Sequence, residues 1–100
     1  MNQNIQNILL HICCKEFDIT LTELMSRSQK RNTVNARRIA AKIFRNKDLT
    51  VVQVGKILDR HYSSICILER STSTILNHDV KLNEKYYRIM SSLQIYCFNK

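Results

Sequence analysis

The chain has 100 residues, one glycine, no proline, an apolar fraction of 44% and a net charge of +8 at pH 7. This composition is typical of a single helix-rich globular domain and excludes a disordered or collagen-like chain. No apolar run approaches the roughly 18 residues of a membrane span, and no secretory signal is recognisable, so we expect a cytoplasmic protein that does not bind a membrane.

The positive charge belongs to the middle of the chain. Between Arg27 and Arg70 there are eleven lysines and arginines against three acidic residues, whereas five basic residues balance five acidic ones elsewhere. A solvated surface usually mixes both signs, so a segment of one sign indicates a polyanionic partner.

The four cysteines and three histidines do not form a metal-binding pattern. Cys13 and Cys14 are adjacent, which hinders their binding of one metal ion, and no C-x-x-C spacing occurs. Cys13 and Cys97 fall on or beside apolar helical stripes, which predicts reduced thiols in the core. We therefore expect no metal site.

Two helices are predicted near the N-terminus. Apolar residues at helical spacing predict the first from about residue 4 to residue 14, followed by a connector in which Phe17 enters the core. Thr20 and Glu23 form a capping box, which predicts the start of a second, short helix.

A polar, basic loop is predicted at residues 26–32. It contains no apolar residue, and in this charge context it is expected to touch DNA phosphates or enter a minor groove, whose negative potential attracts arginine and lysine. The alternative is an exposed, mobile loop without a ligand. The candidate contacts are Arg27, Lys30 and Arg31.

The third helix is predicted from about Thr33 to Arg45, with Asn32 as its N-cap. Its apolar stripe is expected in the core and consists of Ala36, Ile39, Ala40, Ile43 and Phe44. Arg38, Lys42 and Arg45 fall on one opposite, basic face with Arg37 beside them. Arg37, Arg38 and Lys42 have no carboxylate three or four residues away. We expect these three side chains to contact the DNA backbone.

Residues 50–77 have the pattern of a helix-turn-helix. A capping box of Thr50 and Gln53 starts a short helix, and residues 58–61 form a turn before a longer helix. Gly55 lies inside the short helix, where glycine costs roughly 1 kcal/mol relative to alanine. This glycine indicates that a second helix approaches closely.

The longer helix of this motif would place its first residues in the major groove. Its inner face is predicted to carry Ile65, Leu68 and Thr72. The base-reading candidates are His61, Tyr62, Ser63, Ser64 and Ile67, and the further phosphate-binding candidates are Lys56, Arg60 and Arg70. Ile67 is expected to meet a thymine methyl group.

A break at residues 77–79, Asn-His-Asp, is expected to cap the last predicted helix, which runs from about Val80 to Phe98. Its apolar stripe consists of Leu82, Tyr86, Ile89, Leu93 and Cys97 and predicts a helix that packs over the core. The expected architecture is all-α, with about six helices in one domain over residues 1–100.

In this order the elements resemble the C-terminal DNA-binding domain (domain IV) of the bacterial replication initiator DnaA, in the Trp-repressor-like helix-turn-helix superfamily. The residues that carry the resemblance are Asn4-Ile5-Gln6, Phe17-Asp18-Ile19, the basic loop, Ala-Arg-Arg-Ile-Ala at 36–40, Val54-Gly55, Arg60 and Asn77-His78-Asp79-Val80. The resemblance covers roughly residues 3–98. It implies double-stranded DNA as the partner, a place in the nucleoid, a role in replication initiation or transcription regulation, and no cofactor or small-molecule substrate.

The sequence departs from the family at the start of the recognition helix. The family signature is Arg-Asp-His-Ser/Thr-Thr-Val, whereas residues 60–65 read Arg-His-Tyr-Ser-Ser-Ile. The hydroxyl pair is kept, but the aspartate and histidine that read bases of the family's nine-base box are replaced. The resemblance therefore implies major-groove docking without that box sequence. Because the family's ATPase domain is not within these 100 residues, we expect a stand-alone, diverged relative on a mobile element or phage.

Two features of the sequence point to functions other than DNA binding. The loss of the aspartate–histidine pair and the apolar Cys66-Ile67 surface suggest a helical protein-interaction module. His61 beside Ser63 and Ser64 suggests a nucleophile and base, but no orienting carboxylate accompanies them and residues at i, i+2 of a helix do not face one another. We expect no catalytic residues.

Overall fold

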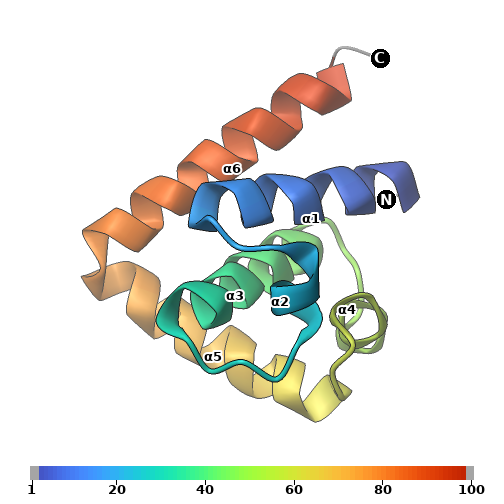
Figure 1. Cartoon of the computed structure of the whole chain (residues 1–100), viewed down its shortest axis with the longest axis vertical. Coiled ribbons are helices and arrows are strands. Elements are labelled where there is room, and N and C mark those ends of the chain that lie inside the picture. The colour runs from blue at the N-terminus through green and yellow to red at the C-terminus, as the bar shows by residue number, and fades with distance from the viewer. Residues whose placement is uncertain (1–2, 99–100) are drawn as a thin grey trace.

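The computed structural model describes the backbone of residues 3–98 and the side chains of residues 3–95. This part of the chain forms six helices and no strand (Figure 1). The helices are α1 (Gln3–Phe17), α2 (Leu21–Met25), α3 (Arg31–Asn46), α4 (Val51–Leu58), α5 (Tyr62–His78) and α6 (Val80–Phe98). α3 lies in the middle and packs against all five other helices. The predicted all-α fold is confirmed. Among the described residues, no helix is both long and apolar enough to cross a lipid bilayer.

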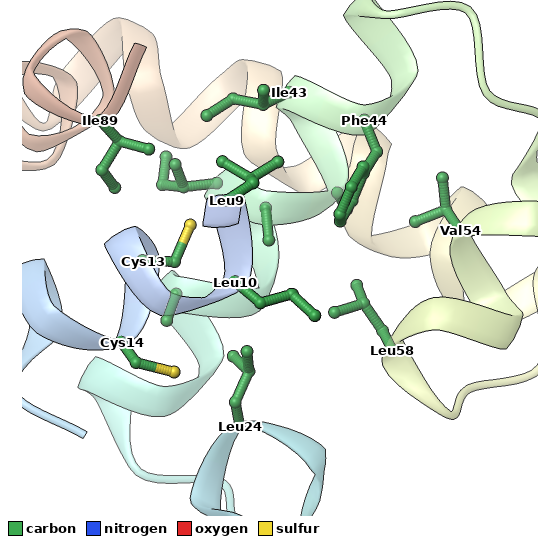
Figure 2. Close-up of a cluster of buried hydrophobic side chains, with 14 of the residues drawn as sticks. Leu9, Leu10, Cys13, Cys14, Leu24, Ile43, Phe44, Val54, Leu58 and Ile89 are labelled. Carbon is green, nitrogen blue, oxygen red and sulfur yellow. The ribbon is translucent and has the colours of Figure 1, made fainter. Parts of the chain in front are cut away.

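The core forms where the apolar stripes of the helices meet around α3 (Figure 2). All five residues of the predicted α3 stripe are buried, as is Phe17 at the end of α1. The first four residues of the predicted α6 stripe, from Leu82 to Leu93, are buried as well. Cys13 is buried as predicted, whereas the side chain of Cys97 lies outside the described residues.

Two helix boundaries differ from the predictions. α1 continues to Phe17 instead of ending near residue 14, and Asp18 follows it in the left-handed conformation with φ 54°. α3 begins at Arg31, after Lys30, which supplies no side-chain cap. The predicted N-cap at Asn32 is wrong, because Asn32 lies in the first turn and its Nδ2 donates to the Phe17 carbonyl at 3.4 Å.

The predicted capping interactions are present at three other helix starts. The Thr20 and Thr50 hydroxyls each accept from the backbone N–H three residues on, at 3.1 Å. Asp79 caps α6, because its Oδ1 accepts from the N–H of Leu82 at 3.0 Å. Each bond satisfies a backbone donor that has no partner inside its helix, and this is why these local patterns set the helix starts.

α6 is held on α1 by basic side chains. Arg88 forms an ion pair with Glu16 at 2.9 Å, and Lys85 donates to the Glu16 carbonyl at 3.0 Å. The Lys85 ammonium also lies 5.1 Å from the centroid of the Phe17 ring. These two basic residues, which lie outside the positively charged segment 27–70, therefore have structural partners. Their contacts fit the prediction that the last helix packs over the core.

Gly55 is the point where α4 approaches the turn that leads to α5. A Cβ atom built on Gly55 would lie 2.5 Å from the Arg60 carbonyl oxygen, and the Arg60 N–H donates to the Gly55 carbonyl at 2.7 Å. A close approach at this glycine is therefore present, but its nearest neighbour is the backbone of the turn at Arg60 and not the expected second helix, whose first residue, Tyr62, has its N atom 3.5 Å from the added Cβ.

Replacing Gly55 by alanine is expected to lower the free energy of unfolding by about 1–3 kcal/mol. The added methyl group clashes with backbone, which outweighs the roughly 1 kcal/mol that alanine contributes to an exposed helix position. Chemical denaturation measures the change, and Lys56→Ala on the exposed side of α4 should shift stability by no more than about 0.5 kcal/mol. A stabilised Gly55→Ala protein would contradict the close approach.

Candidate nucleic-acid interface

α5 begins with a cap formed by His61. The imidazole Nδ1 accepts from the Ser63 N–H at 3.3 Å and lies 2.8 Å from the Ser63 hydroxyl oxygen. The expectation that these two residues do not face each other is therefore wrong, because His61 precedes the helix and has an extended backbone. The contact caps the helix, and the His61 ring also packs on the ring of Tyr62, with centroids 4.4 Å apart.

The outer face of α5 is exposed along its first two turns. Ile65 and Thr72 are buried on the inner face, as predicted, while Ser63, Ser64 and Arg70 are exposed. Tyr62 is 50% exposed and Ile67 is 67% exposed, which are high fractions for large apolar side chains. The predicted base-reading residues are thus brought together on one accessible end of a helix.

A shallow hollow of about 410 Å³ lies at the turn between α4 and α5. Its lining brings together four predicted residues with three others, and the full set is Val52, Gly55, Lys56, Asp59, Arg60, His61 and Tyr62. Val52 is 50% exposed and was not among the predicted site residues. The sequence signal for Val52 is its position in the helical repeat, outside the buried face of α4 that contains Val54 and Leu58.

The basic loop connects α2 to α3 and is shorter than predicted, covering residues 26–30. The Ser26 hydroxyl donates to the Glu23 carbonyl at 2.6 Å and accepts from the Ser28 N–H at 3.1 Å. The Lys30 N–H donates to the Ser28 hydroxyl at 3.3 Å. The loop is therefore shaped by its serines, while its charged side chains are exposed. These are Arg27, Lys30 and Arg31, the last being the first residue of α3.

Arg37 does not belong to the accessible surface. Its side chain is 4% exposed, and its guanidinium donates to four backbone carbonyls around the end of α2, namely Glu23, Leu24, Ser26 and Ser28. Burial, and secondly the neighbouring Arg60 guanidinium, lower the pKa of Arg37. The prediction that Arg37 contacts the DNA backbone is wrong, because every side-chain nitrogen is bonded inside the protein.

Arg60 is also engaged with the protein. Its guanidinium donates to the Asp59 carbonyl at 3.0 Å, to the Met25 carbonyl at 3.4 Å and to the Ser26 carbonyl. The side chain therefore crosses from the helix-turn-helix turn to the start of the basic loop. As a phosphate contact it stays a prediction, but its position is set by the loop.

The remaining predicted cations of α3 lie on a different side of that helix. The Lys42 ammonium is 5.6 Å from the centroid of the Tyr86 ring in α6, and Arg38 donates to Asn35 Oδ1 at 3.0 Å. Arg45 pairs with Glu69 of α5 at 3.3 Å, so the basic face of α3 has an acidic partner that local spacing did not show. Arg38 and Lys42 are half-buried and are not grouped with the basic loop.

The loop and the outer side of the helix-turn-helix carry cations without acidic partners. Within the described side chains, Arg45 is the one central basic residue that forms an ion pair. The exposed, unpaired cations near α5 and the basic loop are Arg27, Lys30, Arg31, Lys56 and Arg70. Solvated cations without acidic partners attract polyanions. We call these five residues the cationic rim.

Residues 3–95 contain no group of histidine, cysteine and acidic side chains arranged to hold a metal ion. Burial raises the pKa of the Cys13 and Cys14 thiols, so neither is a reactive thiolate at neutral pH. The accessible start of α5 and the basic loop offer cations, hydroxyls and a few exposed apolar side chains.

A family model described as the bacterial DnaA protein helix-turn-helix matches residues 5–77 of the chain. The matched range begins in α1 and runs through Asn77, the penultimate residue of α5, so it contains the basic loop, the turn and the outer face of α5. No curated protein matches the sequence.

Proposed function

Because this chain belongs to the bacterial DnaA helix-turn-helix family, we propose that it binds double-stranded DNA with the first two turns of α5 in the major groove. Membership of this family supports DNA binding in general and a role in replication initiation. The groove and the contacting residues proposed below are supported by which side chains of this chain are exposed and which are engaged.

The cationic rim is the observation that carries this proposal. Its five side chains come from the basic loop, the first turn of α3, α4 and α5, and none has an acidic partner within the described structure. Phosphate contacts of this kind fix the orientation of a protein on the duplex without reading its sequence. We assign all five rim residues to the phosphate backbone, with the loop arginine and lysine at the phosphates that border an adjacent minor groove.

The base edges would be met by the exposed start of α5. Ser63 and Ser64 offer hydroxyls that donate or accept, and Ile67 offers an apolar surface suited to the methyl group of thymine. His61 takes the capping position and uses its Nδ1 within the protein, so its Nε2 is the ring nitrogen left for DNA. This division differs from the family signature, in which an aspartate precedes the helix.

Binding to a duplex should weaken steeply as salt is added. Each phosphate contact contributes about −0.9 to the slope of log K against log salt, so five contacts give about −4.5. Affinity should then fall roughly 500-fold between about 50 and 200 mM salt. Selection of duplexes from a random pool at physiological salt identifies the recognised sequence. Fluorescence anisotropy with the selected duplexes at several salt concentrations then measures the slope.

A matched pair of variants tests the location of the rim. Arg70→Ala should reduce the magnitude of the slope by about 0.9, whereas Lys81→Ala, an exposed cation of α6, should leave it unchanged. A flat salt dependence, or equal effects of the two variants, would show that the outer side of α5 is not the DNA-binding surface.

The protein-interaction alternative uses the same face of α5. Its support is the 67% exposure of Ile67, since exposed apolar side chains mark many binding sites. Ile67 is flanked by Ser63 and Arg70 and not by an extended apolar surface, which favours DNA. A random-pool selection that enriches no duplex, together with weak, salt-insensitive DNA binding, would favour the alternative.

A further inference from the structure

Two arginines from distant parts of the chain converge on one backbone carbonyl. Ser26, the first residue of the basic loop, accepts at its carbonyl oxygen from both Arg37 of α3 and Arg60 of the turn before α5. Arg60 also bonds the carbonyl of the preceding residue, Met25. The turn and the loop, the two segments next to the recognition helix, are joined directly by this one side chain.

Apart from the Asp59 carbonyl, which accepts from Arg60, the partners of the two guanidiniums are the last carbonyls of α2 and those of the loop. Such carbonyls have no partner inside their own helix and need donors from elsewhere. No acidic side chain bonds either arginine among the described residues, and the two like charges repel each other. The arrangement persists because the forked guanidinium of arginine reaches several carbonyls at once.

We propose that Arg60 is a positioning residue, which holds the basic loop in a fixed place relative to the start of α5 so that both engage one duplex. This inference rests on the proposed DNA binding. It assigns Arg60 a role different from a phosphate contact, because its Nη1 and Nη2 atoms already donate to carbonyls. The location of the loop cations Arg27 and Lys30 relative to α5 depends on Arg60, whereas Arg37 holds the loop on α3.

The first test needs no DNA. In Arg60→Ala, and also in Arg60→Lys, amide hydrogen exchange of residues 26–30 should rise at least tenfold, while exchange in α1 and α6 stays unchanged. Lysine keeps the charge but lacks the fork, so it should not restore protection. Exchange in the loop equal to that of the unchanged protein in both variants would overturn the inference, whatever the protein binds.

The second test measures whether the loop still contacts DNA, by removing one of its charged side chains. In the unchanged protein, Lys30→Ala should weaken duplex binding roughly five- to tenfold at about 0.1 M salt, as loss of one phosphate contact does. In the Arg60→Ala or Arg60→Lys background the same substitution should weaken duplex binding less than twofold, because the loop no longer contacts the DNA phosphates. In the Arg70→Ala background its effect should remain five- to tenfold.

The salt slope separates positioning from direct contact. Arg60→Ala should reduce the magnitude of the slope by roughly 2, more than the 0.9 expected for one lost phosphate contact, because the loop cations are lost together. A reduction of about 0.9, with additive effects of Lys30→Ala, would show Arg60 to be an ordinary phosphate contact. If the unchanged protein binds no duplex, the proposed function fails, and the exchange experiment still decides whether Arg60 orders the loop.

Discussion

Replacing Arg37 by alanine is expected to lower the free energy of unfolding by about 3 kcal/mol. The substitution removes a buried charge-assisted donor from four carbonyls. The Leu24 and Ser28 carbonyls lose the one donor described for them, whereas the Glu23 and Ser26 carbonyls keep the Ser26 and Arg60 donors. Breaking buried polar networks of this kind is among the mechanisms that produce large destabilisation. Thermal and denaturant unfolding, followed by circular dichroism, measure the loss.

Two neighbouring substitutions provide the controls for Arg37. Arg37→Lys should recover only part of the stability, because an ammonium cannot reach carbonyls on both sides as the guanidinium does. Arg38→Ala should change stability by less than about 0.5 kcal/mol, since Arg38 is half-buried, donates to Asn35 and has an Nε without a partner among the described residues. If Arg38→Ala were the more damaging variant, the assignment of the two faces of α3 would be wrong.

Replacing Phe44 by alanine is expected to lower the free energy of unfolding by about 3–5 kcal/mol. Phe44 is fully buried and projects from α3 into the region that Leu9, Val54 and Leu58 also face (Figure 2). Removing the ring leaves a cavity between α1, α3 and α4, which the helices around it fill only in part.

The matched control for Phe44 is an exposed aromatic residue. Tyr87 of α6 is 62% exposed, so Tyr87→Ala should shift the free energy of unfolding by no more than about 0.5 kcal/mol. Comparable melting temperatures for the two variants would mean that the core is not centred on α3.

Much of the fold follows from short-range patterns in the sequence. The capping boxes at Thr20 and Thr50 and the cap at Asp79 lie at the predicted helix starts, because each bond joins residues only three apart. The apolar stripe of α3 is buried in full, since helical periodicity determines which side chains share a face. These patterns were enough to predict an all-α fold and its helix-turn-helix.

The error at Arg37 has a physical cause. Helical spacing placed Arg37 beside Arg38, outside the apolar stripe, and no local carboxylate explained its charge. In the structure a second buried row runs along α3, formed by Thr33, Arg37 and Ala41, with Arg37 facing the end of α2. The small side chains one turn before and after Arg37 are the signal that sequence analysis missed, because they leave room for α2 to approach.

The sequence by itself determined the helices, their caps, the buried stripes and the excess of positive charge in the middle of the chain. Those properties depend on the types of neighbouring side chains and on helix geometry. Only the tertiary structure decided which arginines are solvated and which are bound internally. The partners of Arg37 and Arg60 are backbone carbonyls, which every residue carries, so no residue type marks them and only the packing of α2 beside α3 and the turn brings them within reach.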